Sequence, residues 1–281
     1  MSKAILAWSS VFTISILVLI LSGTASITMF QIEAIAQQQE NATTSILTNS
    51  NNNTITNANN LINEGISLLL LGKYNEAISL FDKVLAVDPN DVAILTNKGN
   101  VLDTLGIHQE AIQYYDRALA IRPNDVVALE DKGSTLDLLK KYNEAIIYYD
   151  KALTLDPRNV NILYNKGVAL GKLGSYKQAI EYYDQALAIE PNYTGALTGK
   201  GFALHQLANN NQAIVYYDKA LAIDPGNADT LANKAIALAA LHKYDESIKY
   251  YDKALSIEPN LQYAIIGKRL SLEALNQTQI S

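Results

Sequence analysis

Apolar and small residues recur along this chain at a fixed period, starting at Ala58. With Ala58 counted as position 1 of a unit and Val92 as position 1 of the next, position 4 carries leucine or isoleucine, position 8 glycine or alanine, and position 11 leucine. Spacings of four and three residues place these side chains on one stripe of an α-helix. At position 4 stand Leu61, Leu95, Leu129, Leu163, Leu197, Leu231 and Ile265. The pattern predicts a first helix in every unit.

A second helix is predicted to begin near position 17, with a small residue at position 20 and an aromatic residue at position 24. Proline at position 32 ends it, because proline lacks an N–H and biases its predecessor away from the helix. The chain's six prolines are evenly spaced: Pro89, Pro123, Pro157, Pro191, Pro225 and Pro259. A fixed period in the range of roughly 20–50 residues indicates an array of stacked units.

Glycine in mid-helix costs about 1 kcal/mol relative to alanine. Its repeated use at position 8 therefore indicates that the second helix approaches closely there, and we expect the small residues at position 20 to face these glycines. Between the two helices, Gly72, Gly106 and Gly174 each follow a leucine and predict a tight turn.

The pattern Leu163-x3-Gly167-x2-Leu170…Tyr176-x2-Ala179-x3-Tyr183-x2-Ala186…Pro191 resembles the tetratricopeptide repeat (TPR). The resemblance covers residues 58–261 without insertion or deletion, and residues 262–275 resemble the family's capping helix. Two departures are leucine for the family's tryptophan at position 4 and lysine for its usual leucine at position 7. The six units are 58–91, 92–125, 126–159, 160–193, 194–227 and 228–261, followed by the cap 262–275 and a tail, 276–281.

The resemblance implies an all-α fold in which antiparallel helix pairs stack into a right-handed α-α superhelix, a TPR solenoid. It also implies a concave groove lined by the first helices. The family is a scaffold for many different partners, so the resemblance alone identifies none of them.

Position 7 carries lysine and position 25 carries aspartate in a matched series. Every lysine lies the same number of residues after an aspartate of the preceding unit. The first unit has no predecessor, and it alone has Glu64 in place of the lysine. We expect six ion pairs between units, from Asp82–Lys98 to Asp252–Lys268, that set the register of stacking; each is expected to add at most about 1 kcal/mol. The alternative is that both residues are solvated and persist through duplication of the unit.

Positions 2, 5, 6, 9, 12 and 13 lie opposite the leucine stripe and are expected to line the groove. Asparagine recurs at position 6, and a row of amides can pair with the main chain of an extended peptide, as in some TPR proteins. The alternative role for these asparagines is capping or bridging of neighbouring helices. The candidate groove residues are Asn63, Asn97, Asn100, Asp103, Asp131, Asp137, Tyr164, Asn165, Phe202, His205, Asn233 and Ile236.

Two parts of this predicted groove differ in character, and specificity has to come from such differences. Units two and three contribute Asp103, Glu130, Asp131 and Asp137, which suit a segment that carries Lys or Arg. Units four to six are more apolar there, with Tyr164, Val168, Phe202, His205 and Ile236. No full unit has Lys or Arg at positions 2, 5 or 6, which excludes the family's clamp for a C-terminal carboxylate.

The chain has 281 residues, with 22 Lys+Arg against 28 Asp+Glu and no cysteine. The acidity and the lack of a basic cluster argue against a nucleic-acid partner, and without cysteine there is no thiolate or Cys-zinc site. His108, His205 and His242 occupy different positions of the unit, so no metal-ligand spacing arises. The segment from Gly195 to Gly201 resembles a phosphate loop but lacks its spacing. No enzyme activity, cofactor or metal is predicted.

The part of the chain before the repeats, residues 1–57, differs from them. Residues 4–32 carry no charge, and the apolar stretch ISILVLIL within them indicates a secretory signal, with Ala34-Ile35-Ala36 as a cleavage site, or an uncleaved membrane anchor. Residues 1–36 are therefore expected to be a signal peptide or anchor, with a membrane tether through residues 4–30 in the second case. Residues 37–57, rich in Asn, Gln and Thr, are expected to be a flexible linker.

These features predict a non-catalytic scaffold outside the cytoplasm, secreted or anchored, that binds a protein or peptide in its groove. A second interpretation is a structural subunit of a membrane-associated assembly complex that uses its convex face. A third is a glycan-binding module that uses the groove tyrosines. The sequence leaves the oligomeric state open.

Overall fold

The computed structural model describes residues 57–280, and these are helical throughout apart from the short connections. The chain divides into two compact units, residues 1–64 and 65–281, and the second contains the labelled helices. A helix covers residues 57–70. The first helices of the following repeats are α4 (Val92–Thr104), α6 (Val126–Leu138), α8 (Val160–Lys172), α10 (Thr194–Gln206) and α12 (Ala228–Ala240). The second helices are α3 (Tyr74–Val87), α5 (His108–Ile121), α7 (Tyr142–Leu155), α9 (Tyr176–Ile189), α11 (Asn210–Ile223) and α13 (Tyr244–Ile257).

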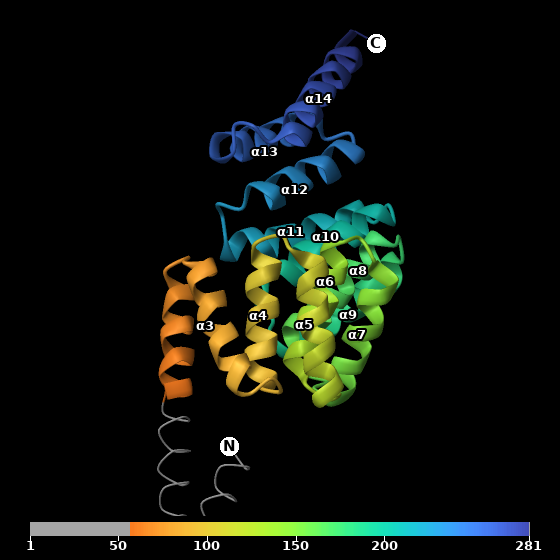
Figure 1. Cartoon of the computed structure of the whole chain (residues 1–281). Helices are drawn as coiled ribbons and strands as arrows, with labels where there is room; N and C mark the ends of the chain where they lie inside the picture. Colours follow the sequence, from red (N-terminus) through yellow and green to blue (C-terminus); the bar gives the residue numbers. More distant parts are fainter. Residues whose placement is uncertain (1–56, 281) are drawn as a thin grey trace, which may run out of the picture. The chain divides into compact units, whose positions relative to one another are not determined.

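Consecutive helices run antiparallel, and the pairs follow one another in sequence order (Figure 1). Each first helix packs against the second helix of its own repeat and against that of the preceding repeat. The expected all-α solenoid of antiparallel helix pairs is confirmed. The last helix, α14 (Gln262–Ile280), continues past residue 275, where the capping helix was expected to end.

The ends of the helices follow from single residues. Asp91, Asp125, Asn159 and Asn227 cap four first helices, each side chain accepting a hydrogen bond from the N–H three residues later. At the turn between helices, Gly72, Gly106 and Gly174 have φ between 70° and 76°, as expected. Lys140, Ala208 and His242 take the same left-handed conformation at the same repeat position, with φ near 60° and without glycine.

The glycines at position 8 lie against the aromatic rings of the second helices. A Cβ added to Gly133 would lie 2.6 Å from Cε1 of Tyr149, and one added to Gly167 would lie 2.6 Å from Cε1 of Tyr183. The nearest atoms are therefore ring atoms and not the alanines that the sequence led us to expect. The small residue makes room for a large buried ring. This explains why glycine is used here despite its low helix propensity.

All six expected ion pairs between repeats are present: Asp82–Lys98, Asp116–Lys132, Asp150–Lys166, Asp184–Lys200, Asp218–Lys234 and Asp252–Lys268. The first five lysines are more deeply buried than expected, with 5–9% of each residue exposed, whereas the aspartates are half-exposed. In repeats three to six the ammonium also donates to a tyrosine hydroxyl of its own second helix, as from Lys166 to Tyr182 at 2.6 Å. Each lysine thus joins two consecutive second helices.

The electrostatics agree with this geometry. Burial alone would lower the pKa of Lys166, but the hydrogen bonds to Asp150 and Tyr182 outweigh it and raise the pKa above its usual value. The lysine is therefore charged and doubly partnered in a largely buried place.

The expected signal or anchor, residues 1–36, lies outside the described residues, as does the expected linker up to residue 56. Within the part of the chain that the structure describes, no helix combines the length and the apolar composition that a bilayer crossing requires.

Candidate binding groove

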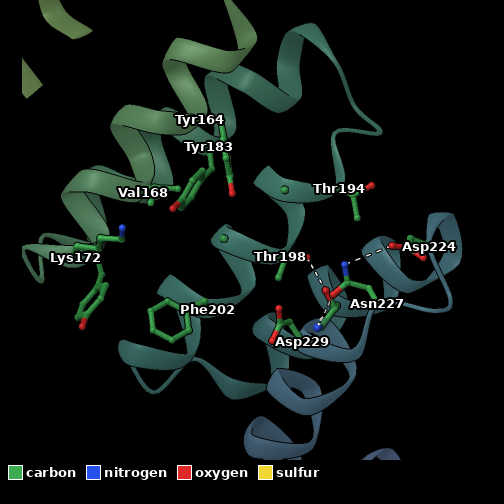
Figure 2. A pocket seen from close by; sticks show the side chains of 15 residues that line it. Tyr164, Val168, Lys172, Tyr183, Thr194, Thr198, Phe202, Asp224, Asn227 and Asp229 are labelled. Atoms are coloured by element: carbon green, nitrogen blue, oxygen red, sulfur yellow. Dashed lines mark hydrogen bonds between the residues drawn. The ribbon is translucent and has the colours of Figure 1, made fainter. Parts of the chain in front are cut away.

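A hollow of about 670 Å³ opens between α8, α9, α10 and the start of α12. Aromatic and polar residues both line it: Figure 2 shows Tyr164, Val168 and Tyr183 on one side, Phe202 further along α10, and Asp224, Asn227 and Asp229 on the other side. The rings of Tyr164 and Tyr183 lie 6.1 Å apart, and Tyr176 meets Phe202 edge-on at 6.4 Å. We call the hollow formed by Tyr164, Tyr176, Tyr183, Gly195, Gly199 and Phe202 the tyrosine pocket.

Two glycines of α10 open the tyrosine pocket. Gly195 and Gly199 stand at positions 2 and 6, where a side chain would enter the hollow. A Cβ on Gly199 would lie 2.7 Å from Cζ of Tyr183, and a Cβ on Gly195 would lie 3.1 Å from the ring of Tyr164. The exposed backbone of α10 thus forms the floor between two sets of rings.

Three of the four asparagines at position 6 are available to a ligand. Asn97, Asn165 and Asn233 are half-buried on α4, α8 and α12, and their side-chain amides form no hydrogen bond with any other described residue. The alternative role, capping or bridging of neighbouring helices, is therefore not seen for these three. Asn63 belongs to the other compact unit and lies in the helix of residues 57–70.

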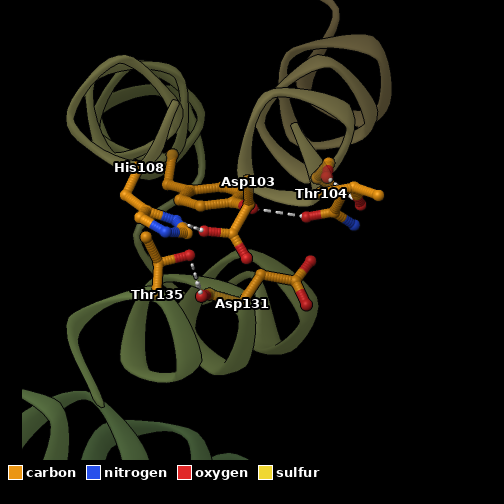
Figure 3. Close-up of polar contacts among 7 residues, drawn as sticks. Asp103, Thr104, His108, Asp131 and Thr135 are labelled. Atoms are coloured by element: carbon orange, nitrogen blue, oxygen red, sulfur yellow. Dashed lines mark hydrogen bonds and ion pairs between the residues drawn. The ribbon is translucent and has the colours of Figure 1, made fainter. Parts of the chain in front are cut away.

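Other predicted groove residues are already engaged within the chain. Asp103 Oδ1 lies 2.7 Å from His108 Nδ1, and His205 Nδ1 lies 2.7 Å from Asn210 Oδ1. Figure 3 shows the contact between Asp103 and His108. Asn100 accepts a hydrogen bond from the Tyr115 hydroxyl at 2.7 Å. Asp103 and His205, both at position 12, thus each contact the start of the second helix of their own repeat.

We call Asp103, Glu130, Asp131 and Asp137 the acidic end of the groove. Asp137 pairs with Lys172 at 2.9 Å, whereas neither Glu130 nor Asp131 forms an ion pair within the described residues. Asp131 Oδ2 and Asp137 Oδ1 are buried without a hydrogen-bond partner. Burial, together with the charge of Asp131, raises the pKa of Glu130. Burial and the charges of Asp103 and Asp125 raise the pKa of Asp131 to about 6, although a hydrogen bond with Asn100 opposes the shift.

Replacing Asp131 with asparagine, the residue of four other repeats at this position, is expected to stabilise the chain at neutral pH. The Asp131 carboxyl has a higher pKa in the folded chain than in the unfolded chain. Its contribution to stability is therefore complete below the unfolded pKa of about 3.9 and is lost as the pH rises through about 6. Asp131→Asn should therefore raise the free energy of unfolding by about 1–3 kcal/mol at pH 7 and by little at pH 4. Urea unfolding at the two pH values measures this, with Glu181→Gln, an exposed carboxylate on α9, as the control. A gain of the same size at both pH values would contradict the assignment.

Among the sequence-predicted residues, Tyr164 and Phe202 share the tyrosine pocket. Ile236 instead lines a separate apolar hollow of about 500 Å³ with Tyr251, Tyr263 and Leu270. The sequence analysis missed Tyr176 as a groove residue and treated Tyr183 only as a core residue. The available signal was the pair Gly195 and Gly199, which stand one turn apart at groove positions of α10.

These surfaces offer three kinds of contact. The tyrosine pocket offers rings and backbone, the asparagines offer amides, and the acidic end offers carboxylates. Among residues 57–280, no group of three or more His, Asp or Glu side chains is placed to hold a metal ion.

Comparisons with known families give a consistent result. Models described as tetratricopeptide repeat match residues 62–126, 160–193, 194–227 and 228–261, and a model described as TPR repeat matches residues 138–174. No curated protein matches the chain.

Several solved structures are similar. YrrB, described as a TPR protein with an unusual peptide-binding site, is 26% identical, and the match covers 67% of this chain and 97% of that chain with a TM-score of 0.55. PilW, described as a widely conserved type IV pilus biogenesis factor, is 20% identical, with 74% and 97% covered and a TM-score of 0.69. A chain of the APC/C hetero-tetramer Cut9–Hcn1 is 20% identical, with 76% and 42% covered and a TM-score of 0.68. At 20% identity, the last two show similarity of fold alone.

Proposed function

Because the chain belongs to the tetratricopeptide repeat family, we propose that it is a non-catalytic scaffold that binds an extended segment of a partner protein in the groove lined by its first helices. The observation that carries this proposal is the row of amides at position 6. Asn97, Asn165 and Asn233 are partly exposed and form no hydrogen bond with other described residues. Each can donate to and accept from the main chain of a peptide at once.

Two further observations support the groove as the binding surface. The tyrosine pocket is large enough for a bulky side chain and exposes Phe202, of which 40% is accessible; exposed apolar patches of this kind mark interaction sites. In addition, YrrB is described as having a peptide-binding site.

Replacing Asn97, Asn165 and Asn233 with alanine is expected to weaken peptide binding and leave the fold intact. Panning a random peptide library on the full-length chain should select peptides that bind it, and their affinity should fall at least about tenfold in the triple variant, because each hydrogen bond contributes about 1 kcal/mol. The matched control is alanine at Asn143, Asn192 and Asn260, three exposed asparagines outside the first helices. Selected peptides that bind the triple variant as tightly as the unmodified chain would place binding on another surface.

We propose further that the scaffold acts outside the cytoplasm, because residues 4–32 carry no charge and precede a small-residue cleavage motif. Terminal sequencing of the protein from its source tests this. A new N-terminus near Gln37 would indicate a secreted protein, and an intact N-terminus in the membrane fraction would indicate an anchored one. An intact chain in the cytosolic fraction would contradict both.

A further inference from the structure

We infer that the partner segment is bipartite: it places an aromatic or bulky apolar side chain in the tyrosine pocket and a Lys or Arg side chain at Glu130 and Asp131. This inference rests on the proposed function, since it assigns the chemistry of the ligand for the same groove.

The apolar half of the groove comprises two hollows along the first helices of the later repeats. Position 9 carries Val168, Phe202 and Ile236 in repeats four to six, and Leu270 stands at the same position of the capping helix, whereas repeats two and three carry Asn100 and Ser134. Val168 and Phe202 line the tyrosine pocket, and Ile236 and Leu270 line the neighbouring hollow. Leu270 is 54% exposed. The change from polar to apolar at one repeat position divides the groove into two halves.

The tyrosine pocket offers several rings that an aromatic side chain can contact. The Tyr164 and Tyr183 rings line one side and Phe202 lies further along α10 (Figure 2). Tyr176 lies edge-on to Phe202, and the glycines of α10 leave room beside the rings. An aromatic ring in such a place gains from burial and from offset or edge-on contacts with its neighbours.

Two carboxylates of the acidic end, Glu130 and Asp131, are not paired with a cation of the described part of the chain. Glu130 and Asp131 have no ion-pair partner among the described residues, and the buried Oδ2 of Asp131 accepts no hydrogen bond. Burying such a carboxylate unpaired is costly, and a hydrogen-bonded ammonium or guanidinium removes that cost. A positively charged side chain from the partner is therefore complementary to this end of the groove.

One segment can reach both places. Lys172 of α8 lines the tyrosine pocket and bonds Asp137 of α6, so the two halves adjoin. The helices α6 and α8 are in contact, and contacting helices lie about 8–10 Å apart. An extended chain covers that distance in about three residues. The cationic and the aromatic residue of the partner are thus expected to be at least about three positions apart.

Synthetic peptides test this. The probes are short Gly/Ser peptides with blocked ends that carry one Arg and one Trp two to six residues apart, titrated into the full-length chain by fluorescence anisotropy. We expect binding to weaken at least about tenfold when the Trp is replaced with Ala, and again when the Arg is replaced with Glu. The combined variant Glu130→Gln with Asp131→Asn should remove the difference between the Arg and Glu peptides, and Glu181→Gln should preserve it. Phe202→Gln should weaken the Trp peptide, whereas Ile147→Gln, on the exposed side of α7, should not.

The outcomes separate this inference from the proposed function. If the library peptides depend on the three asparagines but carry no Lys or Arg and no aromatic residue, the bipartite ligand is wrong and groove binding stands. Equal affinity for the Arg and Glu peptides likewise overturns the inference. If no peptide binds and the chain forms a concentration-dependent dimer through the groove, both proposals fail.

Discussion

Replacing Lys166 with glutamate is expected to lower the free energy of unfolding by about 3–5 kcal/mol, because it buries a second carboxylate beside Asp150. Lys166 is 6% exposed and its ammonium bonds both Asp150 and Tyr182, which belong to the second helices of consecutive repeats. The substitution therefore opposes the stacking of repeats three and four. In an array whose repeats contact only their neighbours, we expect the two halves to unfold in separate steps. Urea denaturation followed by circular dichroism measures both effects.

Two control variants distinguish this ion pair from a general effect of charge. Lys151→Glu makes the same change at an exposed position of α7 and is expected to cost less than about 0.5 kcal/mol. Lys166→Met leaves Asp150 half-exposed in water and places an apolar chain in the buried site, so it should be close to neutral. A glutamate variant as stable as the unmodified chain would show that Lys166 does not join the repeats.

Replacing Leu163 with alanine is expected to cost about 2–5 kcal/mol through the lost burial and the cavity that remains. Leu163 is 1% exposed in the cluster of buried residues that includes Ala179 and Tyr183. Since Tyr183 is also a wall of the tyrosine pocket, peptide affinity should fall together with stability. Denaturation and peptide titration of one preparation give both values.

The matched control is Leu155→Ala at the end of α7, where the side chain is 41% exposed. We expect a loss below about 1 kcal/mol there and unchanged peptide affinity. Similar losses at Leu163 and Leu155 would contradict the packing of the first helices described above.

The repeat made much of this structure predictable, because a fixed period assigns each residue its helix and its face. That register predicts the burial of Leu163, the close approach at Gly167 and the pairing of Lys166 with Asp150. The left-handed turns at Lys140, Ala208 and His242 did not follow, since only the three glycine turns carry a local signal. Their conformation is imposed by the packing of the two helices that they connect.

The binding site was less predictable than the fold. The tyrosine pocket depends on residues from α8, α9 and α10 that meet only after stacking, and Tyr183 serves both the core and the pocket. Asp103 and His205 occupy groove positions, but each finds a partner five residues later at the start of the next helix. A helical wheel assigns a side chain to a face of the helix. It cannot show that the side chain already forms a hydrogen bond with a neighbouring residue.

Photo-cross-linking tests groove binding most directly. A benzophenone amino acid is placed at position 202, in the tyrosine pocket, or at position 147, on the exposed side of α7, and each full-length variant is irradiated with the same library-selected peptide. Peptide binding in the groove predicts a cross-linked product from residue 202 and none from residue 147. A product from position 147 alone would contradict it.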